Sequence, residues 1–177
     1  MEQIIAAAIN CGFSRCKPLK PATLRPLPQV RQMCQADRCR AWNKSWSCPP
    51  ACGTLEACTA RLTAYREGVL VQTTGMLEDP FDYESMMETE AKHKAAFQKL
   101  HRLLRQQFPD LLALGAGCCT LCQSCTYPDT PCRFPEEMTS AMEAYGLMVS
   151  QVCKENGLGY NYGENTVTFT SCFLLNR

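Results

Sequence analysis

The sequence predicts a small α+β domain, in which a mixed or antiparallel sheet packs with two main helices and carries two cysteine-rich metal loops. Three observations indicate this class. Short β-branched and apolar runs alternate along the chain with longer amphipathic stretches. The length of 177 residues suits one domain over residues 1–177. Fourteen cysteines, most of them in clusters at 34–58 and 115–135, are more than packing alone explains.

The first half of the chain predicts one helix and one strand. Residues 1–10 place apolar side chains along one side of a short helix. Residues 17–28 contain four prolines and are expected to be extended connecting chain. The run VLVQTT at 69–74 is apolar and β-branched, so it predicts a buried strand that ends before Asp79-Pro80.

The second half predicts the longest helix, at 83–108, with Asp82 as its N-cap and apolar residues recurring every three or four positions. The apolar run LLALGA at 111–116 predicts a short strand that leads into the later cysteine cluster. Residues 140–156 begin with a capping-box pattern and predict a helix with a kink at a glycine. Residues 157–175 predict a closing hairpin with a Gly-Glu-Asn turn.

Several residues with possible chemistry are expected to be structural. His93 and His101 have no partner that the sequence places beside them, so we expect them at the surface or its boundary. Four isolated cysteines are expected to pack as small apolar side chains. They are Cys11, Cys16, Cys153 and Cys172.

The later cysteine cluster has the more specific spacing. Cys119, Cys122 and Cys125 repeat as C-x2-C-x2-C, and Cys132 follows after six residues. Three thiolates at this spacing can hold three corners of an iron–sulfur cluster, and a later cysteine can supply the fourth ligand. The turn-forming residues between the last two cysteines suit a loop wrapped around a ligand. We therefore expect a [4Fe–4S] cluster here, with zinc as the alternative.

The earlier cluster is dense but its spacing is less diagnostic. Its members are Cys34, Cys39, Cys48, Cys52 and Cys58. Any four could bind a metal; we favour the first four as ligands and hold Cys58 as the spare. A second [4Fe–4S] cluster and zinc both remain open here. Trp42 and Trp46 could shield a cluster from water or belong to the ordinary core.

Composition and motifs exclude several classes of protein. The net charge of +1, with Lys and Arg interspersed, gives no reason to expect nucleic acid or an anionic membrane as a partner. The first residues lack the basic start of a secretory signal, and no apolar run is long enough to span a membrane, so a cytoplasmic protein is expected. No P-loop, HExxH or dinucleotide-binding motif supports a common enzyme class.

Four stretches together resemble a known family: VRQMCQADRC, WSCPPACGTLE, GVLVQTTG, and the later cysteine cluster with the tail NTVTFTSCFLL. Nearly end to end, the chain resembles a family of predicted metal-binding proteins, a domain of unknown function common in anaerobic bacteria and archaea. The resemblance implies metal binding by its cysteines, which fall on Cys119, Cys122, Cys125, Cys132, Cys34, Cys39, Cys48 and, in the closest relatives, Cys52. Two departures, Trp42-Asn43 and an additional Cys118, remove none of these ligands.

The favoured hypothesis is an iron–sulfur protein with one or two [4Fe–4S] clusters that passes single electrons to or from a redox partner protein, rather than an enzyme. Arg133, beside a ligand, would raise the potential of a cluster, or else pair with Glu136 or Glu137. One alternative is a zinc-binding module for folding or for docking a partner. The other is a cluster-dependent enzyme or a cluster carrier.

Overall fold

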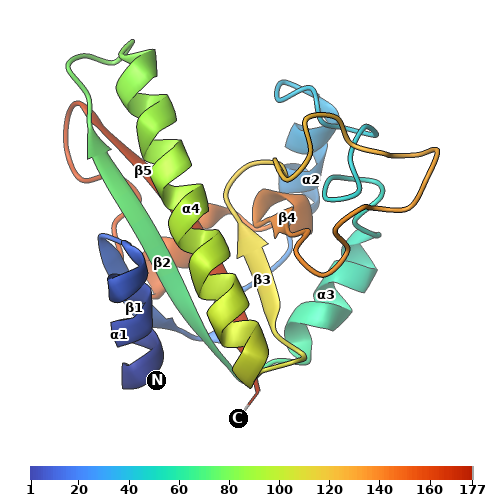
Figure 1. Cartoon of the computed structure of the whole chain (residues 1–177), viewed down its shortest axis with the longest axis horizontal. Coiled ribbons are helices and arrows are strands. Elements are labelled where there is room, and N and C mark those ends of the chain that lie inside the picture. Colours follow the sequence, from blue (N-terminus) through green and yellow to red (C-terminus); the bar gives the residue numbers. More distant parts are fainter. Residues whose placement is uncertain (177) are drawn as a thin grey trace.

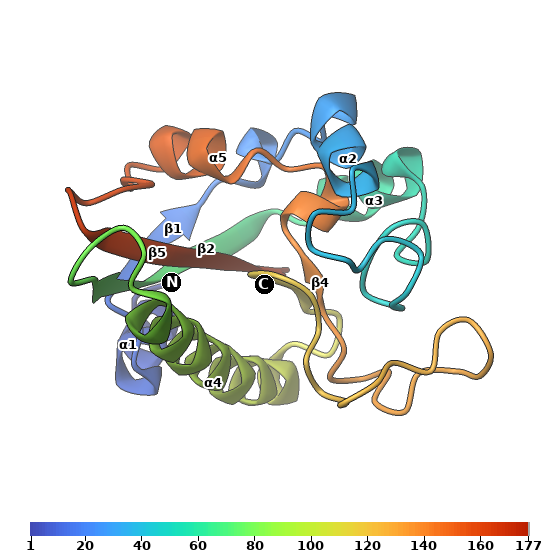
Figure 2. The same cartoon turned by 90° about the horizontal axis from the view of Figure 1, so that it is seen from above.

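A five-stranded sheet lies at the centre of the molecule, with helices on both of its faces (Figures 1 and 2). The computed structural model describes residues 1–176. The helices are α1 (Glu2–Cys11), α2 (Pro28–Gln35), α3 (Leu55–Thr63), α4 (Tyr83–Gln107) and α5 (Val149–Glu155), with short 3-10 turns η1 (Pro21–Thr23) and η2 (Glu143–Tyr145). The strands are β1 (Arg15–Leu19), β2 (Glu67–Met76), β3 (Leu112–Gly115), β4 (Ser140–Ala141) and β5 (Thr166–Leu175). The expected α+β class with a mixed sheet is confirmed.

The strand order is β1-β2-β5-β3-β4. The long strands β2 and β5 pair antiparallel over their whole length, from Glu67 opposite Leu175 to Met76 opposite Thr166. β3 pairs antiparallel with β5, whereas β3 and β4 are parallel. The later cysteine cluster lies in the connection between these two parallel strands.

Helices α1 and α4 cover one face of the sheet. Phe97 of α4 stacks on Phe173 of β5, with ring centroids 4.8 Å apart. Val69 and Val71 of β2 point to the same side and are fully buried there. Because side chains alternate along a strand, these residues form one apolar face of the β2–β5 pair. The apolar stripe of α4, the longest helix, packs along this face.

Helices α3 and α5 lie over the opposite face (Figure 2). The alternate residues of the central strands, such as Leu70 and Cys172, pack there against Leu62 of α3 and Val152 of α5. Cys153 and Cys172 are fully buried, as expected, and Cys11 and Cys16 pack against the core of the other face. In the described part of the chain, no helix has the length and apolar character needed to cross a membrane.

Four predicted elements form close to their expected bounds, and others differ. Helices α1 and α4 and strands β2 and β3 confirm the predictions, and the Asp82 carboxylate accepts the Ser85 N–H at 3.0 Å as an N-cap. The prolines of 17–28 do not prevent β1, because β1 is the edge strand, where Pro18 is tolerated. The helices α2 and α3 form in segments for which the sequence pattern predicts no regular element.

The predicted helix over 140–156 is wrong in its first half. Ala141 pairs with Gly115 in the sheet, and the next turn, η2, ends at Gly146 with a left-handed φ of 78°. An alanine Cβ at this glycine would lie 2.6 Å from a methyl of Leu55, so glycine is also required by packing. Helix α5 starts only at Val149.

The predicted closing hairpin is also wrong. Only its second strand, β5, forms, and β5 pairs with β2 and β3, which are far from it in sequence. The pairing with β2 buries apolar residues on both faces, which a local two-stranded hairpin could not do.

The expectation for the two histidines is wrong as well, because both are buried. The two ring nitrogens of His93 lie 2.9 Å from the Thr73 hydroxyl and 2.7 Å from the Ser171 hydroxyl. Burial lowers the pKa of His93 to about 3 and also lowers the pKa of His101. His93 is therefore a neutral core residue that joins α4 to β2 and β5.

We expect the free energy of unfolding to fall more steeply with decreasing pH in the native chain than in a His93→Gln variant, by roughly 2 kcal/mol between pH 6.5 and 5. The pKa of His93 is about 3 in the folded chain and about 6.5 when unfolded. Between these values the unfolded state binds the additional proton, so the free energy of unfolding decreases as the pH falls. Well above pH 6.5 the imidazole is neutral in both states, and its titration no longer changes the stability. Urea unfolding at several pH values measures this, and parallel pH profiles would contradict it.

Candidate metal-binding site

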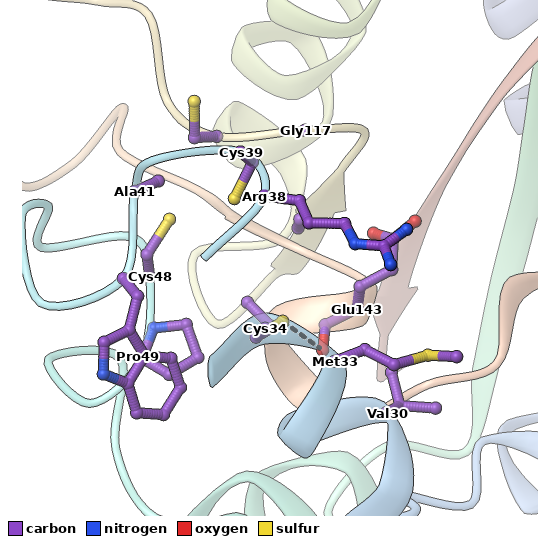
Figure 3. Close-up of a pocket in the computed structure, with 14 residues that line it drawn as sticks. Val30, Met33, Cys34, Arg38, Cys39, Ala41, Cys48, Pro49, Gly117 and Glu143 are labelled. Carbon is purple, nitrogen blue, oxygen red and sulfur yellow. Dashed lines mark hydrogen bonds between the residues drawn. The ribbon is translucent and has the colours of Figure 1, made fainter. Parts of the chain in front are cut away.

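The earlier cysteine segment leaves α2 and reaches α3 without a regular element. Cys34 lies in the last turn of α2. The next turn contains Asp37 with a left-handed φ of 49°, and its carboxylate accepts the Trp42 N–H at 2.8 Å. This tight winding brings Cys39 and Cys48 back towards Cys34 (Figure 3).

The later cysteine segment leaves the end of β3 and returns at β4. Gly117, with φ of 71°, turns the chain at its start. Within the loop, Arg133 donates to the Ser124 carbonyl at 2.9 Å, and the Thr126 hydroxyl donates to the Pro131 carbonyl at 3.0 Å. Arg133 therefore holds the loop itself. The acidic residues considered as its partners pair instead with α4, as Arg102–Glu137 and Arg105–Glu136.

Two buried serines join the two segments, which lie side by side at one end of the molecule (Figure 1). The Ser47 hydroxyl accepts the Cys119 N–H at 3.2 Å, across 72 positions of sequence. Ser45 and Ser47 lie within hydrogen-bond distance of each other at 3.0 Å, and the Ser47 hydroxyl is 3.7 Å from the Cys48 sulfur. These bonds hold Cys48 next to the start of the later loop.

Aromatic side chains make a second junction between the segments. The Trp46 indole donates to the Thr130 carbonyl at 3.1 Å, and its ring meets the Tyr127 ring edge-on at 4.9 Å. The Tyr127 hydroxyl donates to the Asn43 side-chain oxygen at 2.8 Å. Trp46 is therefore neither an isolated surface residue nor part of the main core: it fixes the position of the later loop.

We call the cavity between α2, the earlier loop and the start of the later loop the first cysteine pocket. It has a volume of about 310 Å³ and is lined by Cys34, Cys39, Cys48 and Cys118. Figure 3 shows the sulfur atoms of Cys39 and Cys48 turned towards the space between them. The other lining residues are largely apolar and include Val30, Met33, Ala41, Trp42 and Ala144.

A second cysteine pocket, of about 200 Å³, adjoins the first. The four cysteines of the later spacing motif all line it: Cys119, Cys122, Cys125 and Cys132. Cys39, Ala41 and Cys118 line both pockets and so form part of the boundary between them. Trp42 lines the first pocket and Trp46 the second.

Two thiols of the first pocket, Cys34 and Cys48, have raised pKa values. Burial raises the pKa of Cys48 to about 11; the Ser47 hydroxyl opposes the change, and charge on Cys118 and Cys39 adds to it. Burial, together with charge on Cys39, also raises the pKa of Cys34. Neighbouring thiols that cannot all become anionic alone are well matched to a cation, which neutralises their charge when it binds.

In the second pocket, the pKa of one thiol is raised and that of another is lowered. Burial raises the pKa of Cys119, against a hydrogen bond from the Leu121 N–H. At Cys125 slight burial is outweighed by hydrogen bonds from the backbone N–H groups of Trp46 and Tyr127, so its pKa is lowered. Backbone donors to a sulfur favour its thiolate form, the form that binds metals.

Cys52 and Cys58 form a separate pair near the start of α3. The Cys52 sulfur lies 3.7 Å from the Ala144 carbonyl. Arg31 of α2 donates to the Gly53 carbonyl at 2.9 Å and to the Cys58 sulfur at 3.4 Å. A hydrogen bond from Cys52, and then the charge of Arg31, lower the pKa of Cys58 despite its burial.

The structure therefore gathers seven of the eight cysteines expected as ligands around the two pockets, and Cys52 does not line either one. As they stand, the residues from 1 to 176 include no three His, Cys, Asp or Glu side chains that converge on a single ion. Their donor set nevertheless fits a thiolate-bound metal group: two adjoining cavities, each lined by at least four cysteine thiols.

Sequence reasoning missed the position of Cys118 and the linking role of Ser47. In the resemblance to the family, Cys118 is an additional thiol without an assigned role. The structure places Cys118 in the lining of the first pocket, whereas its neighbour Cys119 lines only the second of the two. No local pattern distinguishes Ser47 from an ordinary loop serine.

One protein-family model, described as "Predicted metal-binding protein (DUF2284)", matches residues 17–175. No curated protein and no solved structure matches the chain.

Replacing Ser47 with alanine is expected to lower the free energy of unfolding by about 1–3 kcal/mol, since the Cys119 N–H loses its acceptor. The matched control is Ser124→Ala, which removes an exposed hydroxyl from the later loop and should change stability by less than about 0.5 kcal/mol. Denaturant unfolding of both variants, followed by tryptophan fluorescence, measures the difference. Equal stability of the two variants would show that this bond does not join the segments.

Proposed function

We propose, since this chain belongs to the predicted metal-binding protein family (DUF2284), that its two cysteine pockets bind iron–sulfur clusters and that the protein passes single electrons to or from a partner protein. The observation that carries the proposal is the convergence of two distant segments on two adjoining pockets lined by cysteines. Each pocket would hold one [4Fe–4S] cluster.

The donor chemistry supports a soft metal. Cysteine thiols are the commonest possible ligands in both pockets, and Glu143 is the one carboxylate among the described residues that line them. Thiolates select iron–sulfur clusters, zinc and monovalent copper over magnesium or calcium, which require oxygen ligands. The C-x2-C-x2-C spacing of the second pocket favours a cluster within this group.

The size of the pockets supports a cluster over a single ion. The first pocket, with a volume of about 310 Å³, is much larger than a single metal ion. Four thiolates around one zinc ion, with Zn–S bonds of about 2.3 Å, leave no such space between them. A cubane of four irons and four sulfides fills considerably more volume.

The surroundings suit a redox centre. Apolar side chains and two half-buried tryptophans line the pockets, which limits water near a cluster, and backbone N–H groups point at the Cys125 sulfur. Local dielectric and hydrogen bonds to sulfur are the means by which a protein tunes cluster potential. Such a cluster accepts one electron from a donor protein and returns it to an acceptor, with no bond made or broken.

The exposure of two ligands supports exchange with a partner. Cys39 in the first pocket and Cys125 in the second are exposed, whereas Cys48 is buried. Each centre would thus reach the surface at one corner, where a redox partner could approach it. Free thiols on such corners need a reducing compartment, which makes the cytoplasm the proposed location.

Zinc is the second candidate, and the long loops favour it. Both cysteine segments lack regular elements over most of their length, and structural zinc stabilises loops of this kind. The protein would then be a docking or folding module without redox activity.

Protein purified without oxygen is expected to contain about eight irons and eight acid-labile sulfides per chain. Its visible absorption should bleach on addition of dithionite and recover on reoxidation, because each cluster takes up one electron. Metal and sulfide analysis on the sample used for the spectrum measures both. Stoichiometric zinc without iron would overturn the iron–sulfur proposal and select the zinc module.

A Cys122→Ser variant is expected to retain about half of the iron and sulfide, because it removes one ligand of the second pocket only. Cys11→Ser is the matched control, since Cys11 is the last residue of α1, is half-buried, packs against the core and lines neither pocket. It should retain the full content. Equal losses in both variants would indicate general destabilisation in place of a missing ligand.

A further inference from the structure

We propose that Cys118, and not Cys52, is the fourth ligand of the first centre, so that the consecutive residues Cys118 and Cys119 bind two different centres. The identity of the metal rests on the proposed function above. The assignment of the ligand does not, because it follows from which thiols surround the pocket.

The lining of the first pocket gives the first argument. Cys34, Cys39 and Cys48 come from the earlier segment, and the fourth cysteine around the same cavity is Cys118, which the later segment brings in directly after Gly117. The first pocket thus has four thiols without Cys52.

The second pocket does not need Cys118. Cys119, Cys122, Cys125 and Cys132 already supply four thiols to it. Cys118 lines the first pocket, which Cys119 does not, so the two neighbours can serve different cavities. The Ser47 hydroxyl, which accepts the Cys119 N–H, fixes the peptide between them.

Cys52 does not line the first pocket, although it packs beside Ala141 and Ala144, which do, and several contacts hold it there. Its N–H donates to the Cys48 carbonyl at 3.1 Å, and its sulfur lies 3.7 Å from the Ala144 carbonyl. The Cys58 sulfur lies 3.9 Å from the Cys52 carbonyl and accepts from the Arg31 guanidinium at 3.4 Å. To reach the first pocket, Cys52 would have to leave all of these partners.

Arg31 adds an electrostatic reason. It donates to the Gly53 carbonyl at 2.9 Å and to the Cys58 sulfur at 3.4 Å, and its side chain is partly buried there. The guanidinium already supplies a positively charged donor to the Cys58 sulfur, so the pair has less need of a metal. The pair is therefore a structural support beneath α3.

Two consequences follow for the site. Cys118 ligation would make the first centre a crosslink between segments that are otherwise joined by a few hydrogen bonds. Since consecutive Cα atoms lie about 3.8 Å apart, ligation by Cys118 and Cys119 would also bring the two centres close together, with a single peptide unit between their ligands.

The experiment compares Cys118→Ser with Cys52→Ser in the full chain, each purified without oxygen and analysed for iron, zinc and sulfide. The proposal expects Cys118→Ser to lose about half of the bound metal and Cys52→Ser to retain all of it. The reverse result would overturn it, as would full retention or equal loss in both. Because metal per chain is counted whichever metal is present, native protein with two zinc ions would refute the iron–sulfur proposal and still test this ligand.

A measurement on the unmodified chain covers the case in which Cys118→Ser fails to fold. The rate at which each cysteine is alkylated is measured by mass spectrometry before and after metal removal by a chelator. The expected result is that Cys118 reacts several-fold faster once the metal is removed, as Cys39 does, while the rate for buried Cys52 changes little. Unchanged reactivity of Cys118 would overturn the proposal.

Discussion

The parallel pairing of β3 with β4 is the constraint on which the cysteine site depends. Parallel neighbours need a crossover that carries the chain back to the starting end, and a helix usually forms it. Here residues 116–139 make the return without a regular element, apart from short turns. Loops longer than about 12–15 residues without structure of their own are uncommon and usually functional. The crossover therefore needs another source of order.

Part of that order comes from the earlier segment and part from the thiols. Ser47 binds the crossover at its start, and Trp46 and Asn43 bind it at Tyr127 and Thr130. Burying several thiols in two small cavities has a cost, visible in the raised pKa of Cys48 and Cys119. A bound cation would reverse that cost, so metal binding would be coupled to the folding of this end of the molecule.

The parts of the fold that were predictable are those specified by local pattern. The β-branched run of β2 and the apolar stripe of α4 are buried over most of their length, and such runs have one plausible structure. The four cysteines of the second pocket could also be recognised from a local pattern, because all of them lie in one loop.

What could not be predicted depends on partners distant in sequence. β5 was assigned to a local hairpin because its pairing with β2, about a hundred residues earlier, leaves no local signal. His93 was assigned to the surface because the hydroxyls that satisfy it, on Thr73 and Ser171, come from two other strands. The first pocket combines both segments, and only the fold shows that Cys118 faces it.

The two pockets also differ in how firmly the fold holds them. Cys34 lies in the last turn of α2, and Cys118 follows β3 by only three residues, so rigid elements position both. In the second pocket, Cys122, Cys125 and Cys132 all lie within the irregular loop. Their positions depend on the contacts of Trp46 and Tyr127 and on the boundary shared with the first pocket. Regular elements therefore position two cysteines of the first pocket, whereas the cysteines of the second pocket depend on contacts of the loop with neighbouring residues.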